Sequence, residues 1–231
     1  MSLLVKAVDY DNPNSIGVRF RKQRREAIEG LIERAFARSG SVRILDLGGE
    51  RTYWKIFDDE FLATRKVTIT LLNRSSENIK NDNSINFVAM TGDACHLDAL
   101  SDNSFDIVHS NSTIEHVGDW ERVESFAREV RRLAPKYYVQ TPYQWFPIEP
   151  HVLFPFFHWM SEGTRAKILL RNMVPRKGNY PDLGYAMRTV QGSRLLDRGQ
   201  MSFLFPDARI RFEWLGPLPK SLIAMRDADN P

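Results

Sequence analysis

The sequence has very little cysteine and no long apolar run. Cys95 is the only cysteine among the 231 residues, which excludes an internal disulfide and a zinc site built from several cysteines. The longest apolar stretch, Val152 to Met160, contains Pro155 and His158 and is far shorter than the roughly 20 residues of a membrane span. No N-terminal run has the features of a secretory signal. We therefore expect a cytoplasmic protein without a transmembrane segment.

Neither sign of charge dominates the chain. Lysine and arginine together number 32 and aspartate and glutamate 29, so the net charge is +3. A nucleic-acid-binding protein usually concentrates far more positive charge on one face, so no specific nucleic-acid partner is expected. Two basic clusters, Arg19 to Arg25 and Arg165 to Lys177, fit solvated helix faces. The second would also suit an anionic acceptor or peripheral contact with a membrane surface.

Short β-rich segments alternate with helical ones over the first part of the chain. The expected strands are Val42–Leu47, Val67–Leu72, Ile85–Met90, Phe105–Val108 and Tyr137–Gln140. Apolar spacing predicts helices over Phe20–Phe36 and Tyr53–Phe61, and a third helix capped by Asp119. This alternation predicts an α/β fold, a mostly parallel sheet with helices on both faces. Arg209–Leu215 and Ser221–Met225 are joined by too short a link for a parallel crossover, so they should be antiparallel neighbours.

The alternation breaks after the fifth expected strand. Residues 141–192 are rich in aromatic residues, Pro, His and Arg and show no clean period. We interpret them as an insertion, or lid, within one domain that spans residues 1–231. Its aromatic side chains either pack as a second small core or line a pocket for an apolar or ring-bearing acceptor. After it, Ser193 can cap a short helix that leads to Phe205.

Glycines and polar residues stand at the ends of the first four expected strands. In chain order these residues are Gly48 and Gly49, Asn73, Gly92 and Asp93, and Ser110 and Asn111. An open parallel sheet binds its ligand beyond the carboxyl ends of its strands. The pattern therefore predicts one ligand site at this edge.

The order and spacing of these motifs, from Val42 to about Pro142, resemble those of the class I S-adenosylmethionine-dependent methyltransferases. The elements that carry the resemblance are Ile44-Leu45-Asp46-Leu47-Gly48-Gly49, Asn73, Gly92-Asp93-Ala94, Ser104-Phe105-Asp106-Ile107-Val108 and Ile114-Glu115-His116-Val117. The resemblance implies a Rossmann-like sheet of seven strands whose last two form an antiparallel hairpin. It also implies S-adenosylmethionine as cofactor and methyl transfer to a small-molecule or lipid-like acceptor, which the sequence does not identify. The oligomeric state is likewise not indicated.

The first loop would hold the methionine part of the cofactor. By the resemblance, Gly48 and Gly49 would face that part, and Asp46 would orient the loop and, through water, the ammonium group. A glycine lets the backbone approach a ligand closely. The family commonly places glycines at alternate positions, whereas Glu50 and Thr52 stand here where two of them are expected.

The other motif residues would hold the nucleoside. Asn73 occupies the position of the acidic residue that binds the ribose hydroxyls. Asp93 would accept a hydrogen bond from the adenine amino group, and the Ala94 N–H would face a ring nitrogen. Ser110 and Asn111 would lie next to the methyl group and the amino acid tail.

His116 and His151 are the candidates for a general base, because imidazole titrates near neutral pH. Glu115 and Glu149 would orient them. The alternative is structural: His116 would cap the region after the fourth strand, and Glu149 with His151 would tie down the insertion.

The insertion starts at the carboxyl end of the fifth strand, beside the expected methyl group. Tyr143, Trp145 and Glu149 are therefore expected to contact the acceptor. No metal site is expected, because no tight ligand spacing connects His109, His116, His151 and His158.

Two other interpretations come from different classes. A nicotinamide-dependent dehydrogenase needs Gly-x-Gly-x-x-Gly and an acidic residue about 20 residues later, and this chain lacks both. A methyltransferase-like binding protein without activity fits the replacement of loop glycines by Glu50 and Thr52.

Overall fold

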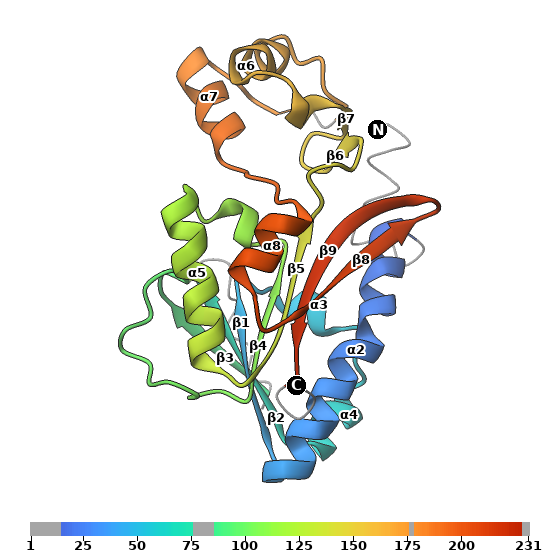
Figure 1. Cartoon of the computed structure of the whole chain (residues 1–231), viewed down its shortest axis with the longest axis vertical. Helices are drawn as coiled ribbons and strands as arrows, with labels where there is room; N and C mark the ends of the chain where they lie inside the picture. The colour runs from blue at the N-terminus through green and yellow to red at the C-terminus, as the bar shows by residue number, and fades with distance from the viewer. Residues whose placement is uncertain (1–14, 76–85, 176–177, 228–231) are drawn as a thin grey trace.

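A seven-stranded sheet forms the centre of the computed structural model, which describes residues 15–75, 86–175 and 178–227 (Figure 1). The strands are β1 (Val42–Leu47), β2 (Val67–Asn73), β3 (Phe87–Thr91), β4 (Ile107–Asn111), β5 (Lys136–Pro142), β8 (Arg209–Leu215) and β9 (Leu218–Arg226). They lie in the order β3-β2-β1-β4-β5-β9-β8, with the first five parallel and β8 and β9 antiparallel. The predicted sheet and its terminal hairpin are thereby confirmed. Ile85, the first residue of the expected third strand, lies outside the described residues.

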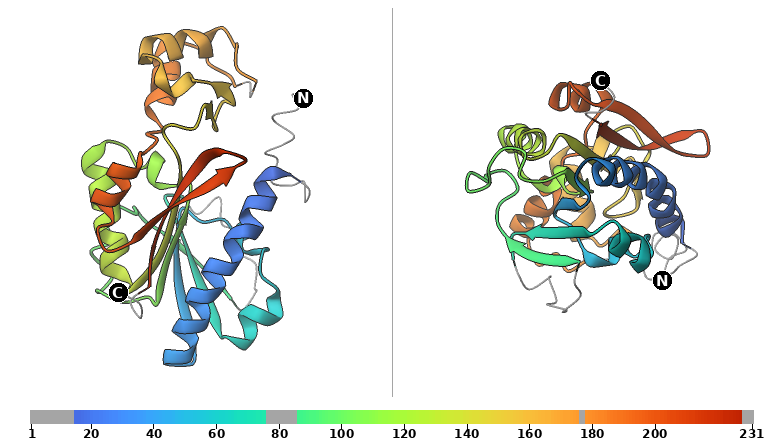
Figure 2. Two further views of the ribbon diagram at one scale, coloured as in Figure 1. Left: turned by 45° about the vertical axis from the view of Figure 1, so that its right-hand side comes forward. Right: turned by 90° about the horizontal axis from the view of Figure 1, so that it is seen from below.

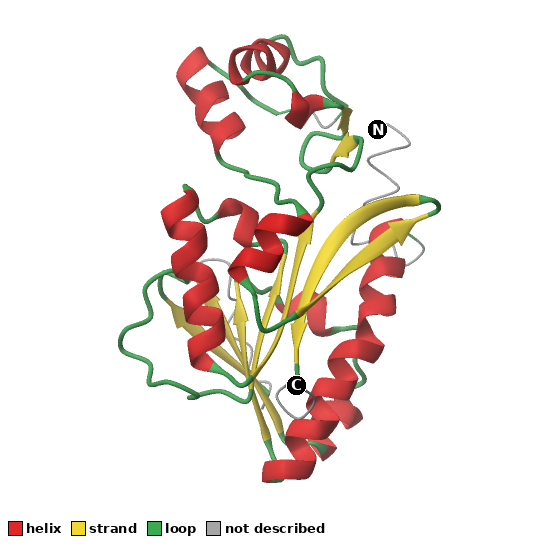
Figure 3. Cartoon of the chain, in the orientation of Figure 1, coloured by secondary structure: helices red, strands yellow, loops and turns green. Residues whose placement is uncertain are grey.

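Helices cover both faces of the sheet (Figures 2 and 3). Successive residues of β1 point to opposite faces, so Ile44 joins one buried apolar cluster and Leu45 the other. The first cluster includes side chains of α2 (Ile16–Ser39), α3 (Arg51–Trp54) and α4 (Asp59–Thr64). The second includes side chains of α5 (Trp120–Leu133) and α8 (Arg198–Leu204). Strands that are covered on both faces explain the short, almost wholly apolar segments of the sequence.

Several helix boundaries follow from local capping chemistry. Ser15 Oγ accepts from the Val18 N–H at 3.1 Å, and α2 ends before Gly40, whose φ of +70° is a conformation that glycine adopts readily. Asp119 caps α5 through the Arg122 N–H, as predicted. Tyr53–Phe61 is not one helix, because the chain turns between α3 and α4. The cap before Phe205 is also not Ser193: Asp197 forms a capping box with Gln200 at the start of α8.

The fourth strand begins and ends later than expected. Ser110 and Asn111 belong to β4, where they pair with Val139 and Gln140 of β5. The sequence predicted that both would follow the strand, beyond the ladder. The strand continues because these two residues extend the backbone ladder with β5, although the pairing of β4 with β1 ends at His109.

The insertion has its own apolar core. It contains the hairpin β6 (Ile148–Glu149) and β7 (Phe154–Pro155), the short turn η3 (Phe157–Trp159), and helices α6 (Glu162–Leu170) and α7 (Leu183–Gln191), shown at the top of Figure 1. Buried side chains from this segment include Val152, Phe157, Ala166, Leu169, Ala186 and Val190. The exposed fractions of Trp145 and Trp159 are 57% and 43%, so only part of the aromatic set is in this core. Among the described residues, no helix is long and apolar enough to cross a membrane.

A buried ion pair joins α2 to β8. Arg24 Nε donates to Glu213 Oε1 at 2.7 Å and Arg24 Nη2 to Glu213 Oε2 at 2.6 Å. The same guanidinium donates to Asn111 and Gln140 at the ends of β4 and β5. Although burial favours the neutral acid, the hydrogen bond from Arg24 and the charge of Lys220 hold the pKa of Glu213 below its usual value.

Replacing Arg24 by methionine tests this link. The Arg24→Met variant leaves the Glu213 carboxylate buried without its main partner, so the free energy of unfolding should fall by about 3–5 kcal/mol. Urea denaturation measures the change. The double variant Arg24→Met/Glu213→Leu should recover most of it, because no buried charge is left. A single variant within about 1 kcal/mol of wild type would show that the pair does not hold α2 to the sheet.

Candidate functional site

A cavity of about 280 Å³ opens at the carboxyl edge of β1, β2, β3 and β4. Its lining consists of Gly48, Leu72, Asn73, Arg74, Ser75, Gly92, Asp93, Ala94, Thr113, His116 and Val117. The strands thus bring together residues that are as far apart in the sequence as Gly48 and His116. Of the residues expected to bind the cofactor, Gly48, Asn73, Asp93 and Ala94 belong to this lining.

Close packing shapes the loop after β1. Gly48 has φ +70°, and a Cβ there would lie 2.5 Å from Thr113 Oγ1. A Cβ on Gly49 would lie 2.0 Å from Asp46 Oδ2. Both positions therefore need glycine, whereas Glu50 and Thr52 stand at the beginning of α3. The departure from alternating glycines arises because the helix starts immediately after the second glycine.

Asp46 holds this loop from inside the protein. Its carboxylate is buried, accepts from Trp54 Nε1 at 2.8 Å, and lies 2.7 Å from His109 Nδ1. Ser110 Oγ donates to the Leu47 carbonyl at 3.2 Å, and the Asn111 side chain accepts from Arg24. The side chains of Asp46, Ser110 and Asn111 thus have protein partners, and none of the three is in the described cavity lining.

Asp93 has a partner that the sequence analysis missed. Arg122 Nη2 from α5 donates to both carboxylate oxygens, at 2.8 and 2.7 Å, and the Cys95 N–H donates to Oδ1 at 3.0 Å. Burial favours the neutral acid, but these bonds together hold the pKa of Asp93 below its usual value. The carboxylate therefore stays charged and correctly oriented as a hydrogen-bond acceptor at the cavity. Arg122 lies three residues after the Asp119 cap, and no sequence signal connects it to Asp93.

A second cavity of about 460 Å³ lies between the insertion and the loop before α5, at Gly118 and Asp119. Its polar lining residues include Gln144, Glu149, His151, His158, Glu162, Arg165, Thr189, Gln191, Ser193 and Arg194. Tyr143 packs against Phe212, with ring centroids 5.1 Å apart, and Trp145 packs against Trp159. Of the three residues expected to contact the acceptor, only Glu149 is in the described lining of this cavity.

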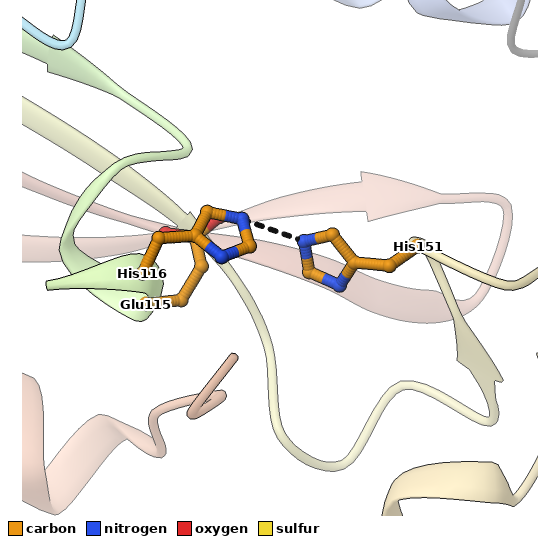
Figure 4. A group of neighbouring side chains, drawn as sticks. All are labelled: Glu115, His116 and His151. Atoms are coloured by element: carbon orange, nitrogen blue, oxygen red, sulfur yellow. Dashed lines mark hydrogen bonds between the residues drawn. The ribbon is translucent and has the colours of Figure 1, made fainter. Parts of the chain in front are cut away.

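His116 and His151 meet between the two cavities (Figure 4). Their Nε2 atoms lie 2.9 Å apart; His116 lines the first cavity and His151 the second. His116 Nδ1 lies 2.8 Å from the Gly192 carbonyl, and His151 Nδ1 lies 2.5 Å from Glu149 Oε1. Because both partners only accept hydrogen bonds, each Nδ1 carries the proton. The two Nε2 atoms are therefore left to contact each other.

Glu115 completes the group from the turn η2 (Ile114–His116). Its carboxyl is 1% exposed, and burial raises its pKa. Oε2 accepts from Thr141 Oγ1 at 3.0 Å, but Oε1 has no hydrogen-bond partner in the part of the chain that the structure describes. Glu115, His116 and His151 each offer one atom that can bind a metal ion, and these three atoms lie within 4.8 Å of one another. No metal site was predicted from the sequence, because no tight ligand spacing connects His109, His116, His151 and His158.

Comparisons with known proteins agree with this geometry. Residues 57–136 match the family model of a methyltransferase domain. The N-terminal domain of EvdMO1, solved in the presence of SAH and D-fucose, has a TM-score of 0.53 and 16% identity, over 89% of this chain and 82% of that chain. An S-adenosylmethionine-dependent methyltransferase from Mesorhizobium loti has a TM-score of 0.52 and 14% identity, over 81% of this chain and 91% of that chain.

A third similar structure bears a different description. A Rhodobacter sphaeroides protein provisionally described as a zinc-dependent alcohol dehydrogenase has a TM-score of 0.51 and 13% identity, over 81% of this chain and 85% of that chain. At such identities the likeness shows the fold alone. The classic dinucleotide-binding sheet ends in parallel strands, whereas β8 and β9 are antiparallel here. No curated protein sequence matches this chain.

Asn73 supplies a test of the first cavity. Its Nδ2 donates to the Gly49 carbonyl at 2.9 Å, so Asn73→Asp would place a carboxylate oxygen against a carbonyl oxygen. We expect about tenfold weaker binding of S-adenosylhomocysteine, since a lost neutral hydrogen bond is equivalent to about 0.5–1.5 kcal/mol. Isothermal titration calorimetry measures the affinity for S-adenosylhomocysteine. The control is Asn103→Asp on the surface, which should leave this affinity unchanged. Unchanged or tighter binding would mean that ribose contacts outweigh the loop contact.

Proposed function

We infer that this chain is a class I S-adenosylmethionine-dependent methyltransferase, and that it transfers the methyl group to a hydroxyl of a polar small molecule bound beneath the insertion. The observation that carries this proposal is the position of the histidine pair. His116 belongs to the cavity proposed for the cofactor, and His151 belongs to the cavity proposed for the acceptor. Their Nε2 atoms, 2.9 Å apart, stand where the two ligands would meet.

The second cavity favours a hydroxylated acceptor over a lipid-like one. Its lining offers amide, hydroxyl, carboxylate and guanidinium groups. His158 Nδ1 and Arg165 Nε are buried and have no hydrogen-bond partner among the described residues. His158 Nε2 lies 2.8 Å from the Gln144 carbonyl, so His158 Nδ1 is an acceptor, whereas Arg165 Nε is a donor. A molecule with several hydroxyls satisfies both. The D-fucose present with EvdMO1 belongs to this chemical class.

The first cavity would hold S-adenosylmethionine, which supplies an activated methyl group on a positively charged sulfur. Gly48 would allow close approach of the methionine part, and Asn73 and Asp93 would bind the ribose and the adenine. Asp93 accepts hydrogen bonds and remains charged, which suits the adenine amino group.

The histidine pair would remove the proton that the acceptor hydroxyl loses. The two Nε2 atoms lie where the acceptor would meet the cofactor, and the Glu149 carboxylate lies 2.5 Å from His151 Nδ1. Burial opposes the charge on Glu149, but the hydrogen bonds that the carboxylate accepts from the His151 side chain and from the backbone, together with the charge interaction with His151, outweigh burial and lower its pKa. A charged Glu149 orients the ring and stabilises its protonated form.

The insertion would serve as the wall of the acceptor site. His151 and Glu149 come from β6 and the turn after it, and Gly192 follows α7, so both arms of the insertion contact the pair. Covering the reacting atoms excludes water and strengthens the electrostatic interactions there.

Substitution of the pair separates binding from chemistry. His151→Ala and His116→Ala should keep the affinity for S-adenosylhomocysteine within a few-fold of wild type. Methyl transfer to hydroxylated small molecules, measured as release of S-adenosylhomocysteine, should fall by about 10²–10⁴-fold, the usual contribution of a positioned acid or base. The matched control is His96→Ala, because His96 is exposed and distant from the cluster in the sequence.

Two results would contradict the proposal. Calorimetry of the wild-type chain without a binding signal for S-adenosylhomocysteine would argue for a different ligand. Turnover that both alanine variants retain would assign the histidines to holding the insertion in place.

A further inference from the structure

Three side chains at the boundary of the two cavities offer the donor atoms of a metal site. Glu115 and His116 come from η2, and His151 comes from the insertion. One carboxylate oxygen and two imidazole nitrogens lie within 4.8 Å of one another, and Figure 4 shows the two rings facing each other. Two imidazoles and one carboxylate are a set that binds divalent transition metals in many enzymes.

The orientation of the rings requires a positive centre between them. Both Nδ1 atoms face hydrogen-bond acceptors, the Gly192 carbonyl and the Glu149 carboxylate. Both Nε2 atoms therefore direct lone pairs at each other over 2.9 Å. Such a contact is favourable only if a proton or a cation stands between the nitrogens. Two nitrogens bound to one tetrahedral ion with bonds of about 2.0–2.1 Å would be about 3.3–3.4 Å apart, so an ion needs the two rings to separate by a few tenths of an ångström.

Glu115 favours the cation over the proton. Its carboxyl is 1% exposed, and Oε1 lacks a hydrogen-bond partner among the residues that the structure describes. A buried carboxylate oxygen without a partner is rare in proteins because its desolvation is not compensated. A proton shared by the two rings leaves Oε1 without a bond, whereas an ion bound by all three residues would use it.

Each of the three side chains is also held by an outer partner. Glu149 contacts His151 Nδ1, the Gly192 carbonyl contacts His116 Nδ1, and Thr141 Oγ1 donates to Glu115 Oε2 at 3.0 Å. Histidine ligands in metal sites usually donate their second N–H to a carboxylate or a carbonyl, which fixes the tautomer and the ring. Here the partner of His151 is a carboxylate, and the partner of His116 is a backbone carbonyl.

We propose that Glu115, His116 and His151 bind a divalent transition-metal ion such as Zn²⁺, whose remaining positions accept the hydroxyl oxygen of the acceptor. This rests on the proposed function and specifies how that site activates its substrate. In this refinement of the proposed function the two histidines hold the ion and do not themselves take the proton. Binding to the ion would lower the pKa of the hydroxyl, and its proton would leave to solvent as the oxygen binds. The oxygen electron pair then forms the C–O bond while the C–S bond breaks and leaves its electrons on the sulfur.

The test uses the full chain after removal of metal with a chelator. Titration with Zn²⁺ alone in a calorimeter should show one ion per chain, and Co²⁺ should give an absorption spectrum of a protein-bound ion. Glu115→Gln, which is nearly isosteric, and His151→Ala should each weaken Zn²⁺ binding at least tenfold. His96→Ala is the control, because His96 is exposed and does not belong to the cluster, and it should bind as wild type does.

The outcomes separate this inference from the proposed function. A flat Zn²⁺ titration of the wild type, or equal binding by Glu115→Gln and wild type, would overturn the metal site. If the histidine variants still lost methyl transfer, the pair would act on the proton alone and the proposed function would stand. If Zn²⁺ bound as expected but S-adenosylhomocysteine did not bind, the proposed function would fail and the metal site would stand. Circular dichroism of each variant checks that it is folded.

Discussion

The close packing of Gly48 on Thr113 is the constraint on which the site depends. A Cβ at Gly48 would lie 2.5 Å from Thr113 Oγ1, and the same hydroxyl donates to the Leu47 carbonyl at 3.0 Å. This contact joins the loop after β1 to the end of β4 and forms part of the first cavity. Thr113 immediately precedes η2, so the contact also places Glu115 and His116. One backbone approach thus sets both the cofactor pocket and the residues proposed to do chemistry beside it.

His116 connects this rigid edge to the insertion. Its Nδ1 contacts Gly192, where the chain leaves α7, and its Nε2 meets His151, which follows β6. The insertion has its own apolar core and returns to the sheet at the bridge between Tyr143 and Leu196. Its position over the sheet edge therefore determines whether His116 and His151 meet. Closure of the acceptor cavity and assembly of the pair are one structural event in this account.

The fold was predictable from the sequence because its determinants are local. Buried parallel strands require short apolar runs, Asp119 and Gly40 mark helix ends, and the short link before β9 permits only an antiparallel pair. The break of Tyr53–Phe61 into two helices was not predictable, because the apolar spacing continues through the turn. In the insertion, α6 and α7 pack around a separate core, so their pattern did not match that of the sheet.

The site was predictable only in part, because only some of its residues are placed by local sequence features. Gly48, Asn73, Asp93 and Ala94 follow strands and so could be assigned to one edge. The pairing of Asp93 with Arg122, and of His116 with His151, depends on tertiary contacts that the spacing of residues in the sequence does not reveal.

The most direct test of the account is a crystal structure with S-adenosylhomocysteine. We predict its sulfur beside His116, with room for an acceptor oxygen about 3–3.5 Å from the methyl position. A ligand bound elsewhere, or with its sulfur directed away from the histidine pair, would contradict the account.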